Sequence, residues 1–379
     1  MENIKNIIIY YPSFERGGGE KIIQNLIFFF IKKKIKIYLI TTNKKNLGPI
    51  KKFKNLSIIY GKTSAFNNLF PKRFSTMMSC IKPLINLLKK LDNNQTVIHS
   101  MQSSYLPIII SKFSNFKIVI RNSEDPISSI KFADEKFYSY IVFILRFFFY
   151  NLADFIITNS KGSANSLRFF LFGKNKSKVK YIYNPYLTKK KIVNSYNKLN
   201  RENIILSVGR LCKQKNFENL ILAFKKFNKK NSKYKLNIIG DGYNKEKLKK
   251  LIRSEKLENK VLLKGYLSNI EKEYKKSKLF ILPSLYEGLG NVLIDAINFS
   301  VPCIVTNCKS GPSEIISHGR GGTLVPVNDI NKMSEAIEYN LSNYSIIKKK
   351  LLYAQKKLYR FDSEKQSMKY LLTLANVLR

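Results

Sequence analysis

The chain has no tryptophan and only four cysteines among its 379 residues. Those cysteines, at positions 80, 212, 303 and 308, have neither the close spacing of metal ligands nor the density of a disulfide framework. A D-x-D triad, which could hold a divalent cation on a diphosphate, is also missing. We therefore expect a protein of a reducing compartment, with no metal site.

Acidic residues are scarce as well. The sequence has 25 Asp and Glu against 68 Lys and Arg, so the formal net charge is +43. Two interpretations stay open: a composition bias toward Lys, Asn and Ile, or attraction to an anionic membrane surface. Nucleic-acid binding is less favoured, because the chain has no zinc-finger spacing, no RRM-type aromatic motif and no heptad zipper.

The sequence also lacks an uninterrupted hydrophobic run of membrane-spanning length. The best candidate, residues 138–158, is interrupted by Arg146, Asn151 and Asp154. We interpret this stretch as a helix and then a strand, lying in a core or on a membrane surface. The first residues read as a strand rather than a signal peptide. The expected location is cytoplasmic, peripheral on the inner face of the cytoplasmic membrane.

Short apolar runs alternate with helical patterns twice along the chain. This rhythm predicts an α/β protein with parallel sheets and right-handed crossovers. A lysine-rich stretch with little apolar periodicity, residues 187–203, separates the two halves. We predict domains at 1–186 and 204–361 joined by that linker. A C-terminal helix in 362–379, capped by Asp362 or Ser363, is expected to pack back toward the first domain.

Two loops at expected strand ends could bind an anion, since open parallel sheets bind ligands at the carboxyl ends of their strands. The first contains Gly17, Gly18 and Gly19, which let the backbone approach a ligand closely at a helix start. A plain tight turn is the alternative. The second contains Arg210 and Lys215, a guanidinium and an ammonium suited to clamp a diphosphate.

A third candidate is the segment 282–306, where an apolar run breaks at Glu287 between turn residues and resumes as a helix. Along that helix, Asn291, Asp295 and Asn298 form one polar stripe. Gly288 and Gly290 would expose N–H groups at the helix start to a phosphate, while Glu287 reaches the attached group. A capping role for Glu287 is the alternative.

In order along the chain, the segments "RGGGEKIIQNL", "IITNSKGSANSL", "YIYNP", "SVGRLCKQKNFENLILAF", "IIGDGYNKEKL" and "LPSLYEGLGNVLIDAINFSVPCIVTNCKSGPSEII" resemble the motifs of glycosyltransferase family 4. The resemblance covers almost the whole chain and is strongest from 204 to 328. It implies a retaining transferase with the GT-B fold, in which two Rossmann-like doubly wound domains face each other across a cleft.

The resemblance also implies roles for individual residues. Arg210 and Lys215 would bind the donor diphosphate, and Glu287 would contact the donor sugar; these three form the expected catalytic group. Asp295 would hold the ribose hydroxyls of the nucleotide. The remaining expected donor-binding residues are Gly18, Gly19, Gly288, Leu289, Gly290 and Asn291.

The chain departs from the family pattern in two places. The family's E-x7-E is here E-x7-D, which leaves Asp295 one methylene short for the ribose. Where many members have a histidine, this chain has Arg121, Asn122 or Ser123 in that neighbourhood. Arg121, Asn122 and His99 are possible acceptor or sugar contacts. We expect His99 to be an ordinary polar residue near the cleft rather than a base. Retaining transfer needs no enzymic base when the departing phosphate takes the acceptor proton.

The expected function is metal-independent transfer of a hexose or N-acetylhexosamine, with no cofactor, from a nucleotide sugar to a lipid-linked or cell-surface glycan. UDP is the expected carrier. The aromatic runs at 28–30 and 147–149 would suit work at a membrane face, although buried helix surface explains each run alone. A GT-B sugar-nucleotide epimerase and a basic nucleic-acid-binding protein remain as alternatives.

Overall fold

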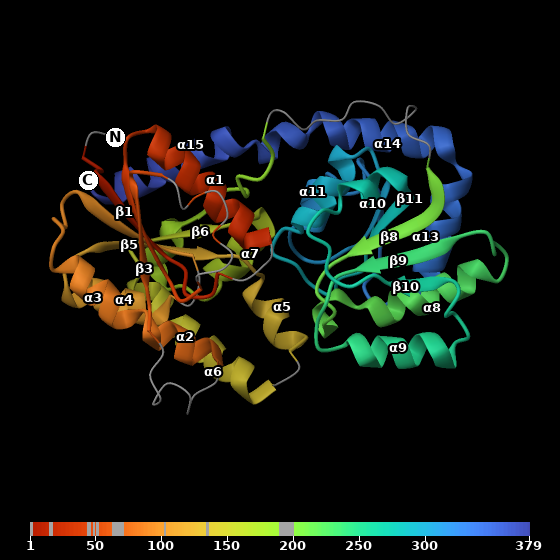
Figure 1. Cartoon of the computed structure of the whole chain (residues 1–379), viewed down its shortest axis with the longest axis horizontal. Coiled ribbons are helices and arrows are strands. Elements are labelled where there is room, and N and C mark those ends of the chain that lie inside the picture. Colours follow the sequence, from red (N-terminus) through yellow and green to blue (C-terminus); the bar gives the residue numbers. More distant parts are fainter. Residues whose placement is uncertain are drawn as a thin grey trace.

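The computed structural model describes residues 3–14, 18–43, 47, 50, 53–62, 72–101, 104–133, 136–188 and 201–379. Two lobes lie side by side, each built around a twisted sheet covered by helices on both faces (Figure 1). Gly17 and most of the expected linker lie outside the described residues.

The N-terminal lobe has, within the described residues, a seven-stranded sheet in which every pairing is parallel. The strand order is β3-β2-β1-β4-β5-β6-β7. Its strands are β1 (Asn6–Tyr10), β2 (Lys36–Thr41), β3 (Leu56–Tyr60), β4 (Thr96–Ser100), β5 (Lys117–Asn122), β6 (Phe155–Thr158) and β7 (Val179–Tyr181). Its helices are α1 (Gly18–Lys32), α2 (Lys72–Ser79), α3 (Ile81–Leu88), α4 (Tyr105–Phe113), α5 (Pro126–Lys131), α6 (Lys136–Phe149) and α7 (Lys161–Arg168), with 3-10 turns η3 (Tyr150–Leu152) and η4 (Gly173–Lys178).

The C-terminal lobe repeats this plan with six described strands, again all parallel, in the order β10-β9-β8-β11-β12-β13. The strands are β8 (Glu202–Val208), β9 (Lys235–Ile239), β10 (Val261–Leu263), β11 (Ser277–Leu282), β12 (Cys303–Thr306) and β13 (Thr323–Val325). The helices are α8 (Phe217–Asn228), α9 (Lys245–Ser254), α10 (Glu271–Lys276), α11 (Asn291–Asn298), α12 (Pro312–Ile315), α13 (Ile330–Ser342) and α14 (Tyr344–Lys356), with 3-10 turns η6 (Lys213–Lys215) and η7 (Leu358–Phe361). The predicted α/β architecture of two doubly wound domains is confirmed.

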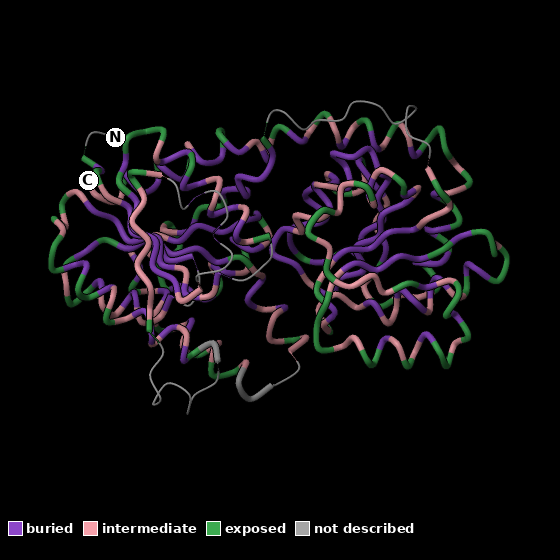
Figure 2. Tube along the Cα trace, in the orientation of Figure 1, coloured by how far each residue is buried: buried purple, intermediate pink, exposed green. Residues whose placement is uncertain are grey.

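The central strands are buried on both faces because helices cover both sides of each sheet (Figure 2). Ile7, Ile8 and Ile9 of β1 are fully buried and point alternately into two different hydrophobic clusters. The cluster on the α1 side continues into the C-terminal lobe, where it includes Leu206 and Leu293. The two lobes therefore share one continuous apolar core on that side.

Two chain segments cross between the lobes side by side. The backbone N–H groups of Tyr186 and Leu187 donate to the carbonyl of Phe361 at 3.2 and 2.9 Å, and Ser363 N–H donates back to the carbonyl of Leu187 at 2.7 Å. After this crossing, the last helix α15 (Ser363–Val377) packs on α1, β4 and β5 of the N-terminal lobe (Figure 1). The Asp362 side chain caps α15 by accepting a hydrogen bond from Lys365 N–H at 2.8 Å.

The described elements differ from the sequence prediction at some edges. Strand β8 begins at Glu202, inside the expected linker, while residues 189–200 of that linker lie outside the described residues. The stretch 138–158 forms most of α6, then η3 and β6, as its interrupting polar residues indicate. Within the described residues, no helix has both the length and the apolar character needed to cross a bilayer.

Candidate active site

The expected site residues follow the two strands at which each strand order reverses. In the C-terminal lobe β8 pairs with β11, and the connections leave these two strands in opposite directions. Such a switch point opens a crevice at the carboxyl ends of the strands. Arg210 and Lys215 follow β8, and Glu287 follows β11. The corresponding position after β1 in the N-terminal lobe is occupied by Gly18 and Gly19.

These residues line one cleft between the lobes, with a volume of about 1040 Å³. From the sequence predictions, the lining includes Gly18, Gly19, Arg121, Arg210, Lys215, Glu287, Gly288, Leu289, Gly290, Asn291 and Asp295. The structure thus brings together all but two of the expected residues, His99 and Asn122. A volume of this size is ample for a ligand as large as a nucleotide sugar.

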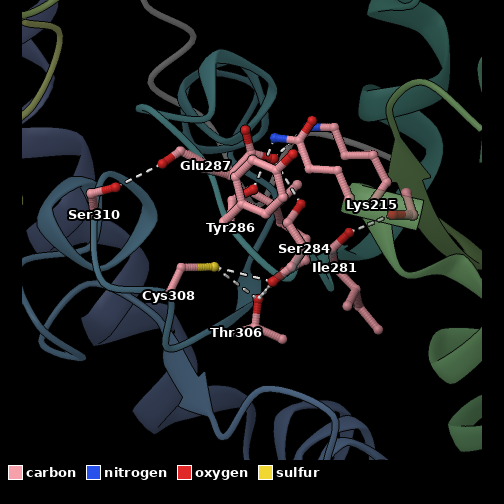
Figure 3. Close-up of polar contacts among 11 residues, drawn as sticks. Lys215, Ile281, Ser284, Tyr286, Glu287, Thr306, Cys308 and Ser310 are labelled. Carbon is pink, nitrogen blue, oxygen red and sulfur yellow. Dashed lines mark hydrogen bonds and ion pairs between the residues drawn. The ribbon is translucent and has the colours of Figure 1, made fainter. Parts of the chain in front are cut away.

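Glu287 and Lys215 form an ion pair on the cleft wall (Figure 3). Their side chains are only 8% and 12% exposed. Ser284 Oγ donates a second hydrogen bond to Oε1 of Glu287 at 2.7 Å. Both partners fix the carboxylate in one orientation, and its burial makes any loss of the lysine costly.

A set of polar contacts holds the loop that carries Glu287 (Figure 3). Ser310 Oγ donates to the carbonyl of Glu287 at 2.7 Å, and Gln214 Nε2 donates to the carbonyl of Tyr286 at 2.9 Å. Thr306 Oγ1 and Cys308 Sγ both contact the carbonyl of Ser284, at 2.5 and 3.1 Å. Because these contacts come from β12, the segment after it and η6, the loop is attached to rigid elements on two sides.

Two helix starts face each other across the cleft, α1 at Gly18 and α11 at Asn291. A side chain added at Gly18 would lie 3.1 Å from Nδ2 of Asn291, so the two helices approach very closely there. Gly290 caps α11 in the left-handed region, with φ of 91°, which favours glycine. The first N–H groups of both helices have no partner within their helices, and they form a natural anion site.

Gly288 makes the closest approach between the lobes in this region. A Cβ at this position would lie 1.9 Å from the carbonyl oxygen of Ser123, which follows β5 in the other lobe. The ring of Tyr286 stacks on that of Phe132, also from the N-terminal lobe, with centroids 6.1 Å apart. The loop around Glu287 is therefore in direct contact with the N-terminal lobe.

Asp295 is engaged by two residues that the sequence analysis did not single out. Tyr186 Oη donates to Asp295 Oδ2 at 2.5 Å, and Lys21 Nζ lies 3.7 Å from Oδ1. Lys21 also lies over the Tyr186 ring, 3.5 Å from its centroid. Lys21 comes from α1 and Tyr186 from the segment between the lobes, so Asp295 ties three parts of the chain together. Lys21 lies in one motif segment and Tyr186 directly follows another, but no pattern in the neighbouring sequence predicts their contact with Asp295.

The three possible acceptor contacts lie at different depths. Arg121 is buried at the cleft wall and donates through Nη2 to Oδ1 of Asn184 at 2.7 Å. Asn122 is buried and donates to the carbonyl of Glu124 at 2.6 Å. His99 is fully buried in β4, where its ring contacts Tyr370 of α15. The structure therefore does not bring the His99 ring to the cleft surface.

A second contact between the lobes involves Glu314 of α12. Its carboxylate accepts hydrogen bonds from the N–H groups of Lys161 and Gly162 at 3.0 and 2.7 Å, and from Tyr183 Oη at 3.2 Å. The C-terminal lobe thus supplies a carboxylate to the start of α7 in the N-terminal lobe. A negative charge there complements the helix dipole and helps to hold the lobes together.

The arrangement can neutralise an extended polyanion. Arg210 is exposed, Lys215 lines the same cleft, and two helix starts point at the same space. Among the described residues, His, Cys, Asp and Glu side chains do not form any group of three or more that could hold a metal ion.

Comparison with known proteins identifies the family. A model described as "Glycosyl transferases group 1" matches residues 188–358. By this match the C-terminal half of the chain belongs to this glycosyltransferase family, family 4. A galactosaminyltransferase of Campylobacter jejuni, named for adding N-acetylgalactosamine to a diacetylbacillosaminyl-diphospho-undecaprenol glycan, is 28% identical over 96% of this chain and 98% of its own length. An uncharacterized glycosyltransferase of Methanocaldococcus jannaschii is 32% identical, and that match spans 62% of this chain and 60% of the archaeal one.

Solved structures agree with the family assignment at the level of the fold. TarM of Staphylococcus aureus, crystallised with UDP, superposes with a TM-score of 0.78 at 16% identity, covering 98% of this glycosyltransferase and all of TarM. Anabaena HepE, crystallised with UDP and glucose, gives 0.77 at 17% identity with the same coverage. The GT-B fold implied by the sequence motifs is therefore confirmed.

Proposed function

We propose that this glycosyltransferase is a retaining, metal-independent enzyme that moves a hexose or an N-acetylhexosamine from a UDP sugar to a lipid-linked or cell-surface glycan. The observation that carries the proposal is the convergence of Arg210, Lys215 and two helix starts on one cleft between the lobes. Family membership supports glycosyl transfer over the epimerase and nucleic-acid-binding alternatives.

The donor diphosphate would lie between the start of α11 and the pair of cations. Arg210 can fork onto phosphate oxygens, and Lys215, which pairs with Glu287 on the cleft wall, would share its charge with the diphosphate. Gly18 and Gly19 would close over the same group from the N-terminal lobe. These charges and N–H groups would do the work that a divalent cation does elsewhere, which is the physical reason for proposing metal independence.

Retention follows from attack on the same face of the sugar that the diphosphate leaves. The acceptor hydroxyl oxygen bonds to the anomeric carbon while the bond from that carbon to the phosphate oxygen breaks. The hydroxyl proton passes to the departing phosphate oxygen, so no side chain has to act as a base. Glu287 would hold the donor sugar in position, and Arg210 and Lys215 would stabilise the negative charge that develops on UDP.

The relatives support the donor and acceptor classes. The Campylobacter protein is named for an N-acetylgalactosaminyl transfer to an undecaprenol-linked glycan, and a Staphylococcus relative for an N-acetylglucosaminyl transfer to poly(ribitol-phosphate). Both structural neighbours described above, TarM and HepE, were crystallised with UDP. A lipid-linked acceptor would be presented at the inner face of the cytoplasmic membrane, where the strongly basic chain would meet anionic lipid.

A donor screen followed by a transfer assay tests the proposal. Thermal unfolding is measured with UDP, GDP and ADP and with their sugars, and UDP release is then measured with a polyprenyl-linked glycan acceptor, with and without EDTA. We expect stabilisation by UDP, acceptor-dependent release that EDTA does not reduce, and retained anomeric configuration in the product. Inversion, or release that requires a divalent cation, would reject the mechanism.

A further inference from the structure

Helix α6 (Lys136–Phe149) has an inverted distribution of polar and apolar side chains. Over residues 139–149, whose side chains are described, the only charged residue is Arg146, and it points inward with a 6% exposed side chain. Its guanidinium pairs with Glu124 at 2.8 Å. Tyr140, Ile141, Ile144 and Phe148 are exposed instead, and Ile144 and Phe148 are 52% and 62% exposed. A surface helix normally has the opposite pattern.

The four exposed residues lie on one side of the helix. At 100° per residue, the positions 140, 141, 144 and 148 fall within an arc of about 100°. Outward-facing apolar side chains that follow each other along a helix form a continuous patch. A continuous apolar patch on a protein surface marks a binding site. The aromatic run at 147–149 is thus only partly used in packing.

The patch continues beyond α6 onto the segment that follows α7. The Phe147 ring contacts the Phe172 ring edge-on at 4.6 Å, and Phe143 contacts Phe170 at 4.7 Å. Phe169 and Phe172 are themselves 80% and 53% exposed. We call the combined surface the α6 face, made of Tyr140, Ile141, Ile144, Phe148, Phe169 and Phe172.

Basic side chains border the α6 face. Lys174 and Lys176, in η4 directly after Phe172, are both exposed. Aromatic and aliphatic side chains rimmed by lysines match the composition of surfaces that lie in the headgroup region of an anionic bilayer. Each nearby lysine strengthens such an attraction, and salt weakens it.

We propose that the α6 face is the surface through which this enzyme docks on an anionic membrane. The inference rests on the proposed function, which requires access to a lipid-linked acceptor, and it assigns that access to particular residues. A second copy of the chain is a poorer occupant, because two molecules that each carry +43 charges repel each other when their lysine-rimmed faces meet.

The position of α6 relative to the cleft suits this role. Strand β5 ends at Asn122 on the cleft side of the sheet, and α5 follows it directly. Phe132, between α5 and α6, stacks on Tyr286 beside Glu287. The N-terminal end of α6 therefore lies near the cleft, and docking through the α6 face would hold the cleft mouth close to the lipid surface (Figure 1).

The test measures sedimentation of the full chain with vesicles of phosphatidylcholine alone or with about one third phosphatidylglycerol. The wild-type protein should sediment with the anionic vesicles and be released by salt. The variant Ile144→Ser/Phe148→Ser should lose about tenfold or more of this partitioning, since two apolar anchors are removed. The variant Lys174→Gln/Lys176→Gln should lose partitioning onto the anionic vesicles but not onto vesicles of phosphatidylcholine alone.

The matched control is Ile346→Ser/Leu352→Ser on α14, where both side chains are 45% exposed and lie outside the α6 face. It should sediment like the wild-type protein. Undiminished sedimentation of Ile144→Ser/Phe148→Ser would overturn the proposal. So would a wild-type protein that is dimeric without lipid and becomes monomeric in that variant, because the face would then bind a second copy. Transfer to a water-soluble acceptor, measured in the same proteins, separates a failure of docking from a failure of the proposed activity.

Discussion

Tyr186 donates a hydrogen bond of 2.5 Å to Asp295, 109 residues further along the chain. Burial, with the negative charge of Asp295 as a second cause, raises the pKa of Tyr186 well above its usual value, so the phenol stays protonated and is the donor. The carboxylate that is expected to hold the ribose is thus already oriented by the segment between the lobes. Lys21 of α1 lies beside its other oxygen.

Replacing Asp295 should weaken nucleotide binding without unfolding the protein. We expect Asp295→Asn to raise the dissociation constant for UDP about tenfold, because hydrogen bonds to a charged acceptor are worth roughly 1.5–3 kcal/mol. Titration calorimetry with UDP and with UMP measures the effect. Glu338→Gln, which neutralises an exposed carboxylate on α13, is the control and should bind UDP normally. Equal affinities for the two variants would show that Asp295 does not contact the nucleotide.

The Glu287–Lys215 pair should be strongly coupled in stability. Lys215→Met leaves the buried Glu287 carboxylate without its cation, and we expect a loss of about 3 kcal/mol in the free energy of unfolding. The double variant Lys215→Met/Glu287→Gln should recover most of this loss, because the unpaired charge is gone. Urea unfolding of the wild-type protein, the two single variants Lys215→Met and Glu287→Gln, and the double variant gives the coupling energy. An additive result would mean that the two side chains do not depend on each other, contrary to the ion pair in Figure 3.

The same residues should separate binding from turnover. Glu287→Gln keeps the shape of the side chain but removes its charge. We therefore expect near-normal affinity for UDP and about a hundredfold lower turnover with a donor sugar. Lys215→Met should instead weaken binding of UDP more than that of uridine. Normal turnover in Glu287→Gln would remove Glu287 from the expected catalytic group.

Much of the fold could be predicted from the sequence because most strands are continuous apolar runs between turn residues. Strands β3 and β13 are harder to predict. Leu56–Tyr60 lies at a sheet edge and is only half-buried along its length, and Thr323–Val325 has three residues. Short edge strands bury little apolar surface, so their pattern in the sequence is weak.

The residues on the cleft wall could be predicted because motif segments place them at strand ends. Their partners from the opposite lobe could not. The Tyr186–Asp295 and Glu314–Gly162 contacts join residues more than 100 positions apart. Such pairs depend on how the two lobes sit together, and neither helical nor strand periodicity carries that information. His99 also shows this limit, since nothing in its own segment predicts that its ring is fully buried against Tyr370.

Glu314 should hold the lobes together through the start of α7. In Glu314→Gln only one oxygen remains to accept from the two N–H groups of Lys161 and Gly162, and the favourable negative charge is lost. We expect faster amide hydrogen exchange at positions 161 and 162, with about 1 kcal/mol lost. Glu335→Gln, on an exposed part of α13, should leave that exchange unchanged. Slow exchange retained in Glu314→Gln would argue against the capping contact.

His99 should make the protein less stable in mild acid. Burial, with the nearby positive charge of Arg121 as a further cause, lowers the pKa of His99 from 6.5 to about 4. The carbonyl of Val119 can only accept, so the neutral ring keeps its proton on Nδ1 and donates at 3.0 Å. The unfolded chain therefore binds a proton before the folded chain does. Stability is retained above about pH 6.5 and falls as the pH drops toward 4, by about 3 kcal/mol in all.

The variant His99→Asn isolates this contribution from other acid-sensitive groups. Asparagine can donate through Nδ2 to the same carbonyl but does not titrate, so its unfolding free energy should fall less between pH 6.5 and 4 than that of the wild-type protein. Urea unfolding at several pH values measures the difference between the two. The gap between their stabilities should narrow steadily as the pH falls through this window and then stay constant below it. A gap that is independent of pH would mean that His99 binds its proton at the same pH in the folded and in the unfolded chain, which its complete burial and its contact with Tyr370 argue against.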